Sequence, residues 1–158
     1  MKPLALLALA IPLFAQPRIA NSYTATCVLT LSASTKACTI QQPASGSKTV
    51  QLVSVYVYSS AAITVAQERD GTAATATAGT AGAVNPTTQA AATAKIWTDS
   101  DVGSGTVIPG TIAIPASSAI MLDLEDVQLN GDGTAKNYTV RTSTGTATVT
   151  IILKWREY

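Results

Sequence analysis

Apolar and polar residues alternate along much of this chain, which is the pattern of half-buried β-strands. The segment 146–155 shows it most clearly, with one face formed by Val149, Ile151, Leu153 and Trp155 and the other by Thr148, Thr150, Ile152 and Lys154. The segment 49–58 has the same period, with Val53, Val55 and Val57 on one face and Leu52, Ser54, Tyr56 and Tyr58 on the other. Both segments therefore predict strands that bury one face.

Shorter strands are expected between turn residues such as Asp70-Gly71 and the run 130–133. They cover the segments 24–31, 37–40, 61–69, 72–77, 95–98, 106–114, 119–124 and 137–142. No convincing amphipathic helix separates them, and this argues against βαβ units. The predicted fold is all-β, a two-sheet antiparallel β-sandwich, and the jelly roll is one arrangement that fits the eight or nine short strands.

The segment 78–94 breaks this pattern, because it consists mainly of Ala, Thr and Gly, carries no charge and has no clean period. Such a stretch buries little apolar area per ordered residue, so it is expected to be a long surface loop. A helix over 87–94 is the alternative, since alanine is the best helix former.

The N-terminal segment has the layout of a signal peptide. Lys2 precedes an apolar run over 4–11, and small residues follow, with a cleavage point expected after Ala15 or, alternatively, after Ala20. The run is shorter than the roughly 20 apolar residues of a membrane-spanning helix. The sequence therefore predicts a signal peptide over 1–15 and a single β-sandwich domain over 21–158; the alternative is a buried N-terminal helix or strand.

The two cysteines support export independently. Cys27 and Cys38 lie in two segments with strand character, joined by five residues typical of a turn, and the whole is interpreted as a hairpin. A disulfide between its arms would stabilise the domain by roughly 3 kcal/mol. Two free thiols or a metal pair are the alternatives, although structural zinc takes four ligands and the chain has no histidine.

Composition narrows the classes of function. Charged residues make up 12% of the chain and the net charge is +1, so there is no basic excess to bind a nucleic-acid backbone. Low net charge also leaves little repulsion between copies, and this suits a protein that assembles or adheres. The absence of histidine excludes a Ser-His-Asp triad and every histidine-based metal site.

The acidic residues are the remaining candidates for chemistry. Paired carboxylates support glycoside hydrolysis, and two groups qualify: Asp99 with Asp101, and Asp123 with Glu125 and Asp126. Both groups lie at strand ends beside turn residues, where Asp bonds nearby backbone amides, so a turn role is preferred. Calcium prefers six to eight oxygen ligands, and five donors fall within ten residues: Asp123, Glu125, Asp126, Asn130 and Asp132.

Surface glycans are a further candidate ligand, because aromatic rings stack on sugars where they are exposed. The aromatic candidates are Trp97, Trp155, Tyr56, Tyr58, Tyr138 and Tyr158, although their positions in alternating strands favour core or sheet-face roles. Asn137-Tyr138-Thr139 also matches the N-glycosylation pattern.

Several strand and turn motifs carry a family resemblance. They are Val53-Ser54-Val55-Tyr56-Val57-Tyr58, Glu68-Arg69-Asp70-Gly71-Thr72, the run 99–106, Leu122-Asp123-Leu124 and the run 137–142. Over 53–155 the chain resembles small β-sandwich proteins encoded in phage and prophage structural regions. This resemblance implies a role at the virion surface or tail, without catalytic residues to carry over. The export signal is a departure, since virion proteins assemble in the cytoplasm.

The sequence as a whole predicts an exported, non-enzymatic structural or adhesive β-sandwich without a cofactor. It is expected to act through its surface, by self-association or by contact with other structural proteins. The alternatives are a phage virion component, such as a decoration or tail protein, and a carbohydrate- or calcium-binding module. The secreted or cell-surface location depends on cleavage of the N-terminal segment.

Overall fold

The computed structural model describes most of the chain as strands, and the predicted all-β fold is confirmed. The structure describes residues 20–45, 48–69, 78–79, 82–83, 90–98, 106–124, 127–130 and 133–158. Every regular element among these residues is a strand. None of these residues belongs to a helix long and apolar enough to cross a membrane.

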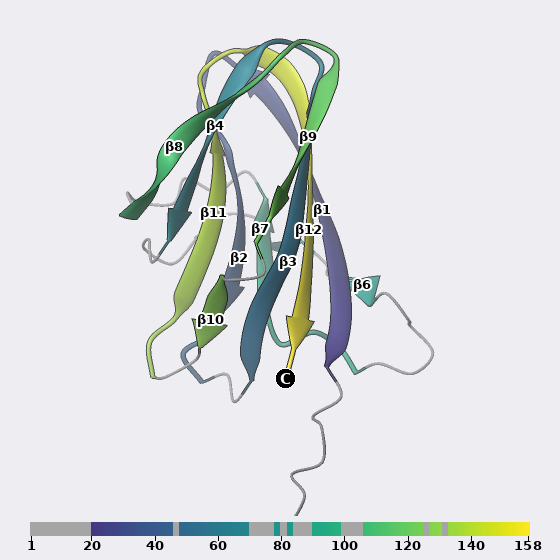
Figure 1. Ribbon diagram of the computed structural model, residues 1–158, viewed down its shortest axis with the longest axis vertical. Helices are drawn as coiled ribbons and strands as arrows, with labels where there is room; N and C mark the ends of the chain where they lie inside the picture. The colour runs from purple at the N-terminus through teal and green to yellow at the C-terminus, as the bar shows by residue number, and fades with distance from the viewer. Residues whose placement is uncertain are drawn as a thin grey trace, which may run out of the picture.

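The strands form two antiparallel sheets that pack face to face (Figure 1). Sheet A has the order β10-β3-β12-β1-β6, with β9 also paired to β3. Its strands are β1 (Asn21–Ser32), β3 (Thr49–Ser59), β6 (Gly82–Ala83), β9 (Ser118–Asp123), β10 (Gln128–Asn130) and β12 (Thr146–Glu157). Sheet B has the order β5-β7-β2-β11-β4-β8. Its strands are β2 (Ala37–Gln42), β4 (Ile63–Arg69), β5 (Ala78–Gly79), β7 (Lys95–Thr98), β8 (Thr106–Ile114) and β11 (Lys136–Thr142).

The pairing of the long strands is nested, and this gives the topology of a jelly roll. The first strand pairs with the last, β1 with β12, and the next pairs inward are β2 with β11, β3 with β9 and β10, and β4 with β8. Such nesting is one long antiparallel ribbon. Rolling the ribbon up adds the pairs β12 with β3 and β11 with β4, and these complete the two sheets.

Four short connections cross between the sheets at one end of the sandwich, and the C-terminus lies at the other end (Figure 1). They span residues 33–36, 60–62, 115–117 and 143–145. Backbone hydrogen bonds join them to one another, as from the Ala33 amide to the Gly145 carbonyl at 2.8 Å. Each connection is too short to hold more than a turn, so this end is compact.

The core lies between the two sheets and confirms the pattern predicted for the last strand. The side chains of Val149, Ile151 and Leu153 in β12 have no exposed surface, and Trp155 is 1% exposed. The Trp155 ring stacks against Tyr23 of β1, with ring centroids 5.7 Å apart. The buried apolar residues of both sheets form a single cluster.

The predicted faces of β3 are wrong in its first half, because the strand contains a β-bulge. The register with β12 shifts between Lys154 and Trp155, which pair with Ser54 and Leu52 and leave Val53 as the extra residue. Leu52 and Val55 are consequently both buried, while Val53 is only partly buried. A strict period of two had placed Val53 on the same face as Val55 and Val57, and Leu52 on the opposite face.

The Ala/Thr/Gly-rich segment 78–94 contains two short strands where it is described. Residues of β6 pair with Tyr23 and Thr24 of β1, and those of β5 pair with Ile96 and Trp97 of β7. Residues 90–94 are not helical. The remainder of this segment, the strand expected over 72–77, the turn at Asp70-Gly71 and the signal peptide over 1–15 lie outside the described residues.

Candidate functional site

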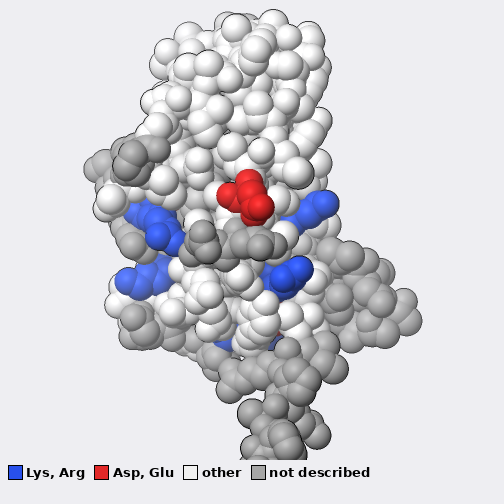
Figure 2. All heavy atoms as spheres, in the orientation of Figure 1, with Lys and Arg blue, Asp and Glu red and all other residues white. Residues whose placement is uncertain are grey.

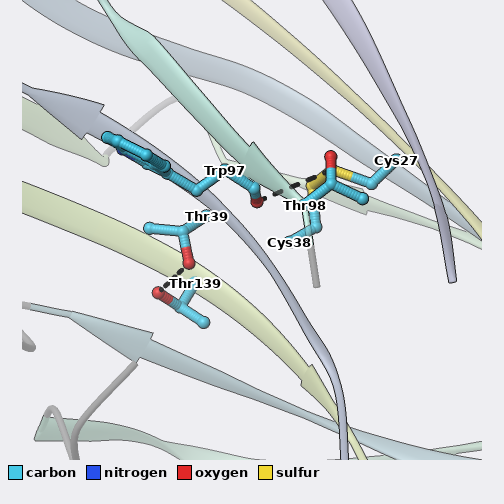
Figure 3. Close-up of a disulfide and its surroundings, with 6 residues drawn as sticks. All are labelled: Cys27, Cys38, Thr39, Trp97, Thr98 and Thr139. Atoms are coloured by element: carbon cyan, nitrogen blue, oxygen red, sulfur yellow. Dashed lines mark hydrogen bonds between the residues drawn. A yellow bond between two sulfur atoms is a disulfide. The ribbon is translucent and has the colours of Figure 1, made fainter. Parts of the chain in front are cut away.

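The disulfide is present, but the interpretation of its two arms as a hairpin is wrong. Cys27 lies in β1 of sheet A and Cys38 in β2 of sheet B, so the bridge joins the two sheets through the core (Figure 3). Their Cα atoms are 6.0 Å apart and neither residue is exposed. The turn between them reverses the chain direction while changing sheets, as jelly-roll connections do. The role of the disulfide is structural, because both cysteines are buried and inaccessible to solvent.

The predicted acidic clusters lie largely outside the described residues. Asp99, Asp101, Glu125, Asp126 and Asp132 lie outside them. Of the calcium set, Asp123 ends β9 opposite Ser54, and Asn130 ends β10 opposite Thr49, so the two are roughly 15 Å apart along β3. No group of three His, Cys, Asp or Glu side chains that could hold a metal occurs in the described part of the chain.

The aromatic residues divide into core and surface. Trp155 and Tyr138 are buried and therefore do not present a ring to a sugar. The partly buried pair Trp97 and Tyr158 donate hydrogen bonds to Gln41 Oε1 at 3.2 Å and Gln51 Oε1 at 2.8 Å, respectively. Tyr56, at 39% exposed, and the partly buried Tyr58 lie on the outer face of sheet A.

The middle of the outer face of sheet B carries polar side chains that are buried. Thr39 and Thr139 lie opposite each other in β2 and β11, both buried, with their hydroxyl oxygens 2.9 Å apart (Figure 3). Beside them Arg141 donates two hydrogen bonds to Glu68, at 2.8 and 3.1 Å. Asn137, on the same face, is 1% exposed, so the glycosylation pattern lies on a buried side chain. These groups are buried and stabilise the sheet, and a shallow hollow of about 400 Å³ lies beside them at Thr64 and Ala113.

Glu157 is a buried carboxylate that sequence analysis missed. It accepts hydrogen bonds at 2.9 Å from the backbone amides of Thr93 and Ala94, and at 3.2 Å from the Trp155 indole. The Lys48 ammonium lies 3.4 Å away. Burial raises the pKa of Glu157, but the hydrogen bonds from Ala94, Thr93 and Trp155 outweigh it and hold the pKa below its usual range. This carboxylate fastens the segment before β7 to the end of β12.

The outer face of sheet A is exposed to solvent along β9, β3, β12 and β1. Every large apolar side chain that the described residues expose lies there: Val28 at 58%, Tyr56 at 39% and Met121 at 73%. Strand pairing aligns them in two neighbouring rows across β9, β3, β12 and β1. The rows are Met121-Tyr56-Ile152-Thr26 and Ala119-Tyr58-Thr150-Val28.

A charged row borders this apolar patch. Asp123 of β9 and Lys154 of β12 both pair with Ser54 of β3, so an anion and a cation flank the same residue. Beyond them lies a hollow of about 450 Å³, lined by Ser22, Thr24, Val53, Lys154 and Arg156 among others. Its two cations suit an anionic group, and among its lining residues there is no acid to serve as a proton acceptor.

The top third of the molecule in Figure 2 shows no charged side chain. This is the end that carries the four short connections, and their thirteen residues include one charged residue, Lys36. The patch on sheet A therefore continues toward an end with a single charge in its connections, which consist mainly of Ala, Ser and Thr.

No family model, curated protein or solved structure matches this chain. The exposed apolar face of sheet A is therefore the feature of this chain that indicates a functional surface. The sequence contained a signal for this surface, since Ile152 and Val28 lie on strand faces whose other residues are polar.

Proposed function

We propose that this chain is an exported, non-enzymatic structural or adhesive module that acts through its surface and assembles with further copies. One observation carries the proposal: the exposed large apolar side chains of the described residues gather on one sheet face instead of scattering. Clustered apolar exposure of this kind is typical of protein contact sites.

The disulfide supports the exported location. Cys27 and Cys38 are joined across the core, and disulfides persist in oxidising compartments such as the cell exterior. The signal-like segment 1–15 points the same way. Both features suit a secreted or cell-surface protein.

The described polar groups support a role without catalysis. The buried carboxylates Glu157 and Glu68 are each bound by donors that stabilise the fold, and the chain has no histidine to act as a general base. The open face of sheet A offers apolar and hydroxyl groups, which suit contact and not proton transfer.

The jelly-roll topology favours a second candidate, a phage virion component such as a decoration or tail protein. Viral capsid domains use this topology, as do lectins. On this alternative the same apolar face contacts neighbouring virion subunits, and the N-terminal segment is retained.

Two measurements test these proposals. Intact-mass analysis of the native protein gives the terminus: a chain that begins after Ala15 or Ala20 supports export, whereas an intact Lys2 contradicts it and favours the virion. Sedimentation velocity over a range of concentrations tests assembly. A single sharp monomer peak at every concentration would remove the assembling role.

A further inference from the structure

We infer that the hollow beside Lys154 and Arg156 on the outer face of sheet A binds an anionic sugar, that is, a sugar unit that carries a phosphate or sulfate group. The hollow lies beyond the apolar patch, so binding there does not depend on assembly with further copies. Three properties of the hollow point to this ligand: its charge, its hydroxyl groups and its size.

The hollow forms at the β-bulge in β3. Lys154 and Arg156 lie two residues apart on β12. Their partners on β3 are Ser54 and Gln51, which lie three residues apart. The extra residue is Val53, which is partly buried and lines the hollow. Because a bulge bends its strand and disrupts the ladder locally, the sheet surface is hollowed between these two rows.

Two cations line the hollow, and no acid lines it with them among the described residues. The Lys154 and Arg156 side chains are both exposed, and neither takes part in an ion pair within the described part of the chain. Asp123 lies on the same face but two strands from Lys154, about 10 Å away. Glu157 follows Arg156 but is buried on the other face of the sheet. The positive charge of the hollow is therefore available to an anion from solution.

Two hydroxyl groups accompany the cations. Thr24 of β1 pairs with Lys154, and Ser22 pairs with Arg156; both line the hollow. Opposite residues of neighbouring strands have Cβ atoms about 5 Å apart, and alternate residues along a strand are about 6.7 Å apart. The four residues therefore mark the corners of a rectangle of about 5 by 7 Å, in which a ligand that contacts the cations also reaches the hydroxyl groups.

The size of the hollow favours a ligand larger than an inorganic ion. Its volume is about 450 Å³, and small-molecule sites have volumes of about 300–1,000 Å³. Val53 supplies an apolar wall for the carbon face of a sugar ring, while the phosphate or sulfate group meets the cations. The ring hydroxyl groups then bond with Ser22 and Thr24. Because both cations are exposed to water, the binding is weak.

An NMR titration of the isotope-labelled protein tests the site. Glucose-6-phosphate, added to about 20 mM at low ionic strength, should shift the amide signals of Thr24, Val53 and Arg156 until they saturate. Glucose should leave these signals unchanged, because it carries no charge. Inorganic phosphate should bind more weakly than glucose-6-phosphate, since it has no ring to pack on Val53.

Three variants separate a local site from a general attraction. Lys154→Met and Arg156→Met should each weaken the binding of glucose-6-phosphate at least about threefold, because each removes one of two cations. Lys95→Met is the matched control, since Lys95 is exposed on β7 of sheet B and its replacement lowers the net charge by the same amount. This variant should bind as the wild type does. All three residues are exposed, and unchanged melting temperatures would show that the variants fold.

Several outcomes would contradict the inferred site. If Lys95→Met weakens binding as much as Lys154→Met, the ligand responds to net charge and the site is wrong. The site is also wrong if glucose-6-phosphate produces no saturating shift, or shifts only signals far from the hollow. Equal affinity for glucose or for inorganic phosphate would overturn the ligand class. None of these measurements reports on assembly, which sedimentation velocity tests separately.

Discussion

Glu157→Gln should destabilise this protein strongly, because buried donors lose a charged acceptor. The substitution keeps the shape of the side chain, so the loss reports only the change of charge and of one acceptor atom. The carboxylate binds the amides of Thr93 and Ala94 and the Trp155 indole, all within 3.2 Å, and is 1% exposed. The glutamine amide keeps one oxygen and presents an NH₂ group to a donor. Hydrogen bonds to a charged group contribute about 1.5–3 kcal/mol each against about 1 kcal/mol for neutral ones, and an orphaned buried donor costs about 1–3 kcal/mol.

Summing one orphaned donor and the weakening of the remaining bonds gives a loss of about 3 kcal/mol in the free energy of unfolding. Urea denaturation at pH 7 measures it directly. For a slope of about 2 kcal/mol per molar, the midpoint should fall by about 1.5 M. Lys48→Met is the control, since it removes the partly exposed partner of the ion pair and should cost at most about 1 kcal/mol.

The difference in the free energy of unfolding between the wild type and Glu157→Gln should depend on pH, because it originates from the charge of Glu157. Hydrogen bonds hold the pKa of Glu157 in the folded protein below its value in the unfolded chain. Its contribution is therefore complete above the unfolded value, about 4.3, and is lost as the pH falls through the lower folded pKa. The gap in stability between the wild type and Glu157→Gln should accordingly narrow below about pH 4.3. A gap that is below 1 kcal/mol at pH 7, or that stays constant on acidification, would refute the reasoning.

Three further predictions concern other parts of the molecule. Replacing Cys27 and Cys38 by alanine should lower the free energy of unfolding by about 3 kcal/mol, and reductant should destabilise the wild type but not the variant. Burial raises the pKa of Tyr138, whose hydroxyl donates to Gln67 Oε1 at 2.7 Å. In an alkaline titration, the phenolate absorbance of the wild type should therefore exceed that of Tyr138→Phe by one tyrosine only after the chain has unfolded. The free energy of unfolding of the wild type should decline above about pH 10, because Tyr138 ionises there in the unfolded chain but not in the folded protein. A calcium chelator should leave the melting temperature unchanged, and a melting temperature that rises with added calcium would contradict this.

Alternation along the chain was enough to predict the long strands and the all-β fold, because a half-buried strand alternates apolar and polar residues with a period of two. The short strands β5, β6 and β10 were not predicted. β12 is the best example, with Val149, Ile151 and Leu153 all buried as expected. Where two apolar residues are adjacent, the period is ambiguous. Leu52 and Val53 are such a pair, and the bulge that decides between them depends on the register with β12, which local sequence does not encode.

Local sequence also could not predict which strands pair with each other. A connection of four residues after β1 is compatible with a hairpin and with a crossing between sheets, so the pairing of Cys27 with Cys38 was predictable but its placement across the core was not. Glu157 had a signal that was overlooked. It lies two residues after Trp155, so the period of the strand points it into the core as well.

The Cys27–Cys38 disulfide also determines how the sandwich responds to a pulling force at one end. Asn21 and Glu157 are paired at the open end of β1 and β12, so tension applied to these two residues peels the strands apart one pair at a time. Six pairs precede Cys27. There the covalent link to Cys38 transfers the load on β1 to sheet B, so that β1 is peeled away no further. A module that holds two surfaces together would yield by a short, fixed length under force and then resist.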